Sequence, residues 1–167
     1  MAIRQLTAAD IPAMRQLAMA FFTAHSEALD IPLTELQQRP PGYFQEFLSM
    51  VDAVYGYEDA QSQLRGWMAF AADGDTLVIV VGAYDPTVSA RNLKAALDAL
   101  AKQMRDAAVA RGFTHLRGRV QKAYTAGVNY WSGFGLVDAG LVTTVQTANG
   151  EAWEATVPLA RYSQGVV

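Results

Sequence analysis

The sequence has no cysteine and only two histidines, His25 and His115, in 167 residues. The absence of cysteine excludes disulfide bonds, thiolate nucleophiles and zinc sites with cysteine ligands, and it is compatible with a reducing compartment. The two histidines stand far apart and in none of the short spacings that bind metals, so we interpret each as an ordinary surface or core residue. No metal site is therefore expected.

Long hydrophobic runs are also missing. The longest one is LVIVVGAY at 77–84, less than half the length of a membrane-spanning helix. The first residues, MAIRQLTAAD, are polar where a secretion signal needs an apolar core. We therefore expect no membrane association and a cytoplasmic location.

An excess of positive charge is absent as well, because 13 basic residues stand against 16 acidic ones. A dedicated nucleic-acid-binding domain is normally basic, so nucleic acid is not an expected partner. The charges are nevertheless segregated along the chain, since residues 87–122 hold eight bases against two acids. This stretch is typical either of a local anion site or of a solvated helix face, and the charge pattern leaves both interpretations open.

Hydrophobic residues make up 51% of the chain, and we expect a single domain over residues 1–167 with one core. Apolar spacing predicts the order β-α-α-β-β-β-α-β-α-β-β, with a proline-rich loop over 30–42. The run TLVIVV at 76–81 predicts a central strand covered on both faces. The predicted strands are 3–6, 53–57, 64–71, 76–84, 115–120, 141–147 and 153–159, and the predicted helices are one from the Thr7 cap to 24, then 43–51, 89–110 and 125–132.

Common catalytic and nucleotide-binding motifs are missing. The stretch Gly133-Phe134-Gly135 leaves a predicted helix and has Asp138 where the dinucleotide fingerprint needs its third glycine. The junction YDPTVSARNLK at 84–94 is more informative, because an apolar strand ends there and a long helix begins. Unpaired amides at a helix start attract phosphate groups, while the alternative is a simple helix capped by Ser89.

Several short motifs together resemble the GCN5-related N-acetyltransferases, the GNAT superfamily, over almost the whole chain. Tyr84-Asp85-Pro86 is similar to the V-x-P that ends the family's fourth strand, and residues 89–94 align with its Q/R-x-x-G-x-G/A loop. Further along, YWSGFG at 130–135 resembles the family's F-Y-x-x-x-G-F. The resemblance implies an α+β fold with α/β/α layers, in which a mixed, mostly antiparallel sheet of about six or seven strands carries helices on both faces.

The resemblance also implies a binding site for acetyl-CoA as co-substrate. Both loop glycines are replaced, by Asn92 and Lys94, and the leading Gln/Arg is Ser89. Arg91 and Lys94 can compensate by binding phosphate through their charges. The implied cofactor-binding residues are Ala83, Tyr84, Ser89, Ala90, Arg91, Asn92, Leu93, Lys94 and Tyr124.

The catalytic residues implied by the resemblance depart from the family pattern. The tyrosine that serves many members as general acid aligns with Trp131, whose indole is not a useful acid, and Tyr130 is the adjacent candidate. Asp85 and Glu58 are candidates for the general base. Because the chain has no cysteine, transfer would proceed by direct attack of the amine on the thioester.

Two hypotheses remain open for the function. The first is an acetyl-CoA-dependent N-acetyltransferase whose acceptor is a small-molecule or peptide amine. The second is a catalytically degenerate GNAT-fold protein that acts as a binding or assembly component with a protein partner, for example a phage-type accessory protein. GNAT-like folds often pair through their last strands, so a homodimer is one expected arrangement.

Overall fold

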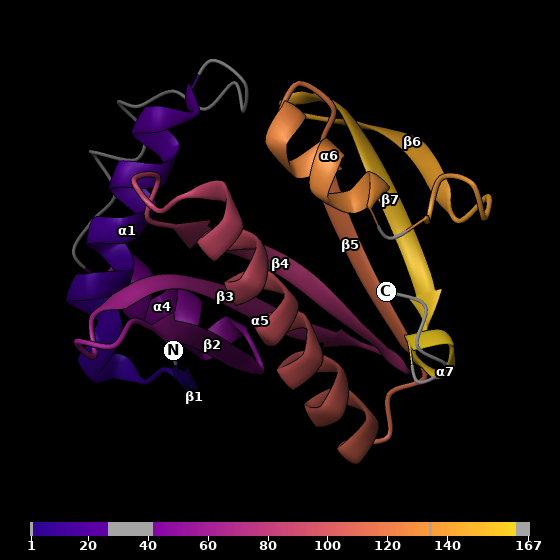
Figure 1. Cartoon of the computed structure of the whole chain (residues 1–167). Helices are drawn as coiled ribbons and strands as arrows, with labels where there is room; N and C mark the ends of the chain where they lie inside the picture. Colours follow the sequence, from indigo (N-terminus) through magenta and orange to yellow (C-terminus); the bar gives the residue numbers. More distant parts are fainter. Residues whose placement is uncertain (1, 27–41, 134, 163–167) are drawn as a thin grey trace.

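The computed structural model describes residues 2–26, 42–133 and 135–162, which form one seven-stranded sheet with helices packed on it (Figure 1). The strand order is β1-β2-β3-β4-β5-β7-β6. Neighbouring strands are antiparallel except β4 and β5, which run parallel. The strands are β1 (Ala2–Gln5), β2 (Ala53–Glu58), β3 (Leu64–Asp73), β4 (Thr76–Tyr84), β5 (His115–Gln121), β6 (Val142–Thr147) and β7 (Gly150–Pro158).

The helices follow the predicted order, so the expected α+β fold class is confirmed. A short 3-10 turn, η1 (Ala8–Asp10), precedes the first helix, and a four-residue helix ends the described chain. The predicted loop over 30–42 lies, except for Gly42, outside the described residues. The helices are α1 (Ile11–Ala24), α4 (Tyr43–Met50), α5 (Ala90–Ala110), α6 (Thr125–Ser132) and α7 (Leu159–Tyr162).

Local chemistry explains where the first helix begins. The backbone N–H of Thr7 donates to Asp10 Oδ2 at 2.8 Å, the reciprocal half of a capping box. Asp10 also accepts from Arg4 Nη2 at 2.6 Å, and the same guanidinium reaches Glu58 on β2 at 2.7 Å. One arginine therefore joins β1, the start of α1 and the end of β2.

The sheet is covered on both faces, as expected. On one face α1 and α4 pack against β2, β3 and β4, and the indole N–H of Trp67 donates to the Met14 carbonyl at 3.1 Å. On the other face α5 packs through Met104 and Ala108 against Phe70 and Leu77. Alternation along β3 sends its successive side chains into these two cores.

The expectation that β4 is a central strand covered on both faces is confirmed except at Val80, since Leu77 faces one core and Ala83 the other. Val80 is 49% exposed, and its neighbours Ile79 and Val81 are half-buried. The strand is central in the sheet, but its second half has lost its neighbour on one side. This half of β4 lies beyond its last pair with β5, and it borders the candidate site.

Candidate active site

The parallel strands β4 and β5 separate partway along their length. They pair over three positions, and the last pair joins Val78 to Arg117. β4 continues to Tyr84 and β5 to Gln121 beyond that point. Figure 1 shows the two strands side by side near α7 and apart toward α6. The sheet therefore opens as a V, which we call the β4/β5 cleft.

A β-bulge in β4 lies where the cleft begins. Ala69 of β3 pairs with Val81 and the next residue, Phe70, pairs with Ile79, so Val80 is the extra residue. Farther along, the Asp85 N–H donates to the Arg65 carbonyl at 2.8 Å. Because successive backbone groups alternate in direction, the amides of Gly82 and Tyr84 face the cleft, whereas that of Ala83 faces β3. In the described part of the chain, no strand pairs with this cleft-facing edge.

A groove of about 1190 Å³ adjoins the cleft on the face of the sheet that carries α5. Helix α5 lines it from Leu97 to Ala110, and α6 lines it through Tyr130 and Trp131. Strands β3, β4, β5 and β7 contribute to its floor. Apolar side chains such as Ile79, Leu116 and Leu136 make up much of its lining.

Trp131 covers the floor of the groove at the point where the strands part. A β-carbon placed on Gly118 of β5 would lie 3.0 Å from Cζ2 of Trp131 and 3.2 Å from Cδ1 of Ile79. Both side chains therefore rest directly on the glycine. The absence of a side chain at position 118 lets the indole approach β5 closely, and this packing role of Gly118 was not apparent from the sequence.

Tyr130 reaches across the groove from α6 to α5. Its hydroxyl donates to Asp98 Oδ1 at 3.0 Å, and Lys94 Nζ donates to Asp98 Oδ2 at 2.6 Å. The predicted general acid, Tyr130, and the predicted phosphate-binding residue, Lys94, therefore both donate to the carboxylate of Asp98. Sequence analysis missed Asp98, although its position four residues after Lys94 on the same helix is a signal for such a pair.

The predicted cofactor loop forms the start of α5. Ser89 is the N-cap, and its Oγ accepts from the Asn92 N–H at 3.4 Å. Ala90, Arg91, Asn92 and Lys94 are exposed, and Leu93 is half-buried. The first turn therefore combines accessible backbone amides with the guanidinium of Arg91, which suits an anion.

An aromatic cluster lies at the far end of β4 and β5. The hydroxyl of Tyr84, at the end of β4, contacts that of Tyr124, which follows β5. Phe21 and His25 of the α1 end pack on both rings, with His25 and Tyr124 centroids 5.0 Å apart. Burial lowers the pKa of His25 and raises that of Tyr84, so both rings are uncharged at neutral pH. Sequence analysis had not connected His25 with the two tyrosines.

The two predicted base candidates lie in ion pairs. Asp85 accepts from Arg65 Nη1 at 2.8 Å and from Thr87 Oγ1 at 2.7 Å. Burial raises the pKa of Asp85, but the hydrogen bonds from Thr87 and Arg65 outweigh it and leave the pKa below the ordinary value. Glu58 is held by Arg4 and lies on β2, which β3 and β4 separate from β5. The structure therefore does not bring Glu58 together with Tyr130.

Most charges of the basic stretch are neutralised by neighbours. Of its eight bases, only Arg91 has no ion-pair partner within the described ranges. Several partners come from distant parts of the chain, such as Asp52 for Arg111 and Glu154 for Arg119. Among the residues that the structure describes, the stretch is therefore mainly a set of solvated ion pairs, and Arg91 is its one cation outside them.

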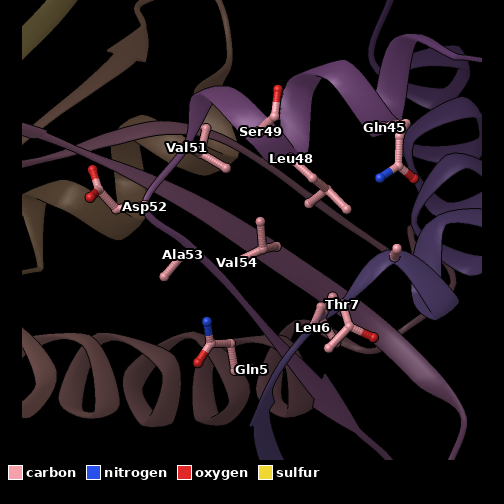
Figure 2. Close-up of a pocket in the computed structure, with 11 residues that line it drawn as sticks. Gln5, Leu6, Thr7, Gln45, Leu48, Ser49, Val51, Asp52, Ala53 and Val54 are labelled. Atoms are coloured by element: carbon pink, nitrogen blue, oxygen red, sulfur yellow. The ribbon is translucent and has the colours of Figure 1, made fainter.

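A smaller pocket of about 300 Å³ lies between α4 and β2 and shares no lining residue with the groove. Figure 2 shows Leu48 of α4 beside Val54 of β2, with Leu6 and Thr7 at one end and Asp52 at the other. Asp52 is already held by the Ala72 N–H at 2.6 Å and by Arg111 at 3.1 Å. This pocket offers no set of groups suited to chemistry.

The described residues include no cluster of three His, Asp or Glu side chains able to hold a metal ion. Nor do they include a helix with the length and hydropathy of a membrane span. The polar side chains that line the groove include carboxylates, hydroxyls and cations, namely Asp98, Asp106, Thr114, Tyr130, Lys102 and Arg105.

The fold, with its parallel pair opening into a cleft beside a long helix, is that of the GNAT superfamily of N-acetyltransferases. No protein-family model and no curated protein sequence matches the chain. Solved structures do match it: the PaiA N-acetyltransferase of Thermoplasma acidophilum in complex with coenzyme A has a TM-score of 0.68 at 14% identity, covering 93% of this chain and 98% of that one.

Two further solved structures have a similar fold. The ribosomal-protein-S18-alanine N-acetyltransferase of Escherichia coli has a TM-score of 0.63 at 14% identity, covering 95% of this chain and 93% of its own. A GCN5-related N-acetyltransferase from Kribbella flavida has a TM-score of 0.63 at 16% identity, covering 94% and 96%. At these identities the likeness establishes the fold, and the activity needs a separate argument.

Proposed function

We propose that this chain is an N-acyltransferase that moves an acyl group, acetyl in the simplest case, from a coenzyme A thioester to an amine. The observation that carries the proposal is the β4/β5 cleft, because β4 presents a strand edge there with amides of Gly82 and Tyr84 facing outward. A pantetheine arm contains amide groups that can pair with such an edge as another strand would. The fold shared with a coenzyme A complex supports the same assignment.

In this proposal the phosphates of coenzyme A lie at the first turn of α5, from Ser89 to Lys94. The helix amides and the charge of Arg91 attract them, while Asn92 and Lys94 stand where the family has glycine. Lys94 would exchange part of its contact with Asp98 for a phosphate oxygen. The arm then follows β4 past Tyr84 and Ala83 toward the bulge, with Tyr124 on the other side of the cleft.

The transfer step needs no covalent enzyme intermediate. The amine nitrogen forms a bond to the thioester carbonyl carbon, the carbon–sulfur bond breaks, and the sulfur receives a proton in place of the one that nitrogen loses. Backbone amides of β4 near the bulge stabilise the negative oxygen of the tetrahedral intermediate. Tyr130 donates the proton to the departing thiolate. Of the two predicted general bases, Asp85 is closer to the cleft than Glu58, because it directly follows β4.

Calorimetric titration with coenzyme A tests the binding half of the proposal. A ligand present at 100 times its dissociation constant should raise the free energy of unfolding by about 2.7 kcal/mol. The Arg91→Ala/Lys94→Ala variant should bind about tenfold more weakly, because it loses charge-assisted hydrogen bonds. Lys122→Ala is the matched control, since Lys122 pairs with Glu151 away from the groove. No binding by the native protein would contradict the proposal.

Thiol release tests the catalytic half. Acetyl-CoA is incubated with a panel of polyamines and short peptides, and free coenzyme A is measured with a disulfide reagent, to which the cysteine-free protein adds no background. Tyr130→Phe should lower kcat by about 100-fold if the hydroxyl acts as general acid. Unchanged turnover in this variant would exclude Tyr130 from that role.

The degenerate alternative has one observation in its favour. Trp131 stands where the resemblance implies a tyrosine acid, and its indole is packed against Gly118 rather than presented as a proton donor. A protein of this kind would bind coenzyme A without releasing thiol from acetyl-CoA for any amine in the panel. The two assays together therefore separate the enzyme from a binding component.

A further inference from the structure

The groove is far larger than an acetyl group requires. Its volume is about 1190 Å³, and α5 lines it from Leu97 to Ala110, a distance of about 20 Å along the helix axis. One end of the groove, which we call its upper end, lies beside Asp98 and Tyr130 and is nearest to the start of α5, where the phosphates would bind. The remainder continues past the cleft toward the opposite end of α5.

This lower part of the groove is apolar. Its walls and floor are formed by side chains such as Met104, Val109, Phe113, Leu116 and Val157. Val109 is 55% exposed on α5, although it faces a concave surface. The charged groups of α5 that line this part are paired with one another, since both Lys102 and Arg105 pair with Asp106. The chemistry of this part therefore favours a hydrocarbon ligand over a polar one.

The lower part is continuous with the site of the proposed transfer step. Ile79 and Gly118 line the groove and directly follow the last pair of β4 and β5, and the side chains of Trp131 and Ile79 both lie over Gly118. A thioester carbonyl near the bulge of β4 thus has the phosphate site on one side and the lower groove on the other. A chain attached to the carbonyl carbon would extend along Trp131 toward Leu116 and Phe113.

We infer that the donor is a phosphopantetheine thioester of a medium-length fatty acid, whose alkyl chain lies in the lower part of the groove between α5 and strands β5 and β7. The inference rests on the proposed function and specifies its donor. The reaction remains the same: nitrogen bonds to the acyl carbon, the carbon–sulfur bond breaks, and the products are an N-acyl amide and the free thiol of the pantetheine arm.

A chain-length series tests the inference. Calorimetric titrations with coenzyme A, acetyl-CoA, hexanoyl-CoA, octanoyl-CoA and decanoyl-CoA should give affinities that rise with chain length, by up to about fourfold for each methylene that becomes buried. Val109→Glu should abolish this gain and leave the affinities for coenzyme A and acetyl-CoA unchanged. Val137→Glu is the matched control, because Val137 is also an exposed valine, 44% accessible, and lies outside the groove.

The outcomes distinguish the inference from the proposed function. If coenzyme A binds and the affinity stays flat from acetyl to decanoyl, the inference is overturned and the proposed function stands. If no coenzyme A compound binds, or only free decanoate does, both are overturned. If decanoyl-pantetheine binds as tightly as decanoyl-CoA, the inference is supported and the natural donor is the pantetheine arm of a carrier protein. If decanoyl-CoA binds markedly more tightly, the inference is supported and the natural donor is an acyl-coenzyme A.

Discussion

Tyr57 is 4% exposed, and its hydroxyl oxygen has no hydrogen-bond partner among the described residues. Its ring packs against Ala96 and Leu100 of α5. Burial and the charge of Asp85 raise the pKa of Tyr57 to about 12, which keeps the hydroxyl protonated. A buried hydroxyl without a partner destabilises the folded state relative to the unfolded one, in which water solvates it.

Replacement of Tyr57 by phenylalanine should therefore stabilise the protein. We expect Tyr57→Phe to raise the free energy of unfolding in urea by about 1 kcal/mol, because the unsatisfied hydroxyl is removed and the ring is kept. Tyr55→Phe serves as the control, since Tyr55 lies on the same strand but is only half-buried. A loss of stability in Tyr57→Phe would show that the hydroxyl has a partner, such as an ordered water.

His25 should make stability depend on pH. Burial lowers its pKa below the ordinary 6.5, so the unfolded chain binds the proton more readily than the folded one. Stability from this residue is present above pH 6.5 and is lost as the pH falls below that value. Urea denaturation at pH 7.5 and 5.5 should show a decrease in the native protein and a smaller one in His25→Phe. Equal decreases in the two proteins would contradict the assignment to His25.

At the scale of single elements, α6 illustrates how one glycine sets the position of a helix. A β-carbon at Gly127 would lie 2.6 Å from Cδ1 of Tyr124 and 2.6 Å from Cγ2 of Val120. The ring of Tyr124 in turn packs against His25 and contacts Tyr84. The close approach of α6 to β5 therefore depends on the missing side chain.

Gly127→Ala should destabilise the protein even though alanine is the better helix former. The gain in helix propensity is about 1 kcal/mol, whereas the overpacking against two side chains costs typically 1–3 kcal/mol. We expect a net loss of about 1 kcal/mol in thermal or urea unfolding. Gly42→Ala is a suitable control, because nothing lies within 4 Å of a β-carbon at that position. A more stable Gly127→Ala protein would mean that Tyr124 moves freely.

The elements themselves were largely predictable from local patterns. The sequence predicted β4 over 76–84 and α6 over 125–132 as observed, and α5 differs by one residue. Gly74 and Gly150, which lie between β3 and β4 and at the start of β7, have positive φ angles of 61° and 96°, which glycine adopts readily. The bulge at Val80 was not predictable, because a bulge is defined by the register against β3 and leaves no mark in an apolar run.

At the scale of the whole molecule, the ion pairs tie distant segments together. Arg111 at the end of α5 pairs with Asp52, which precedes β2, and Arg117 of β5 pairs with Asp73 at the end of β3. The segregation of charge along the sequence is therefore cancelled in space. Since these pairs are partly exposed, each contributes at most about 1 kcal/mol.

This arrangement predicts that two arginines of the basic stretch have separate roles. Arg111→Gln should lower the free energy of unfolding by up to about 1 kcal/mol and leave coenzyme A affinity within about twofold, because its charge is used within the fold. Arg91→Gln should leave stability unchanged and weaken coenzyme A binding several-fold. Urea denaturation and calorimetry on both variants check this, and equal effects of the two substitutions on binding would contradict it.

The candidate site was only partly predictable. The resemblance pointed to the turn after β4 and to Tyr130, and both lie beside the groove. Asp98, Gly118 and His25 were not recognised as parts of the site, because their importance comes from neighbours that are distant in sequence. Tyr130 lies 32 residues from the carboxylate to which it donates.

The sequence by itself determined the order of strands and helices and the helix caps, since these depend on residues within a few positions of one another. Its composition alone determined the absence of thiol chemistry, because the sequence has no cysteine. Only the tertiary structure decided that β4 and β5 part after Val78 and that a largely apolar groove follows α5 from Leu97 to Ala110. It also decided that, among the described residues, Arg91 has no ion-pair partner whereas Lys94 and Arg111 are paired. Those features depend on which segments meet across the sheet. The pairing of segments that are distant in sequence determines these features, and the local spacing of residues does not predict that pairing.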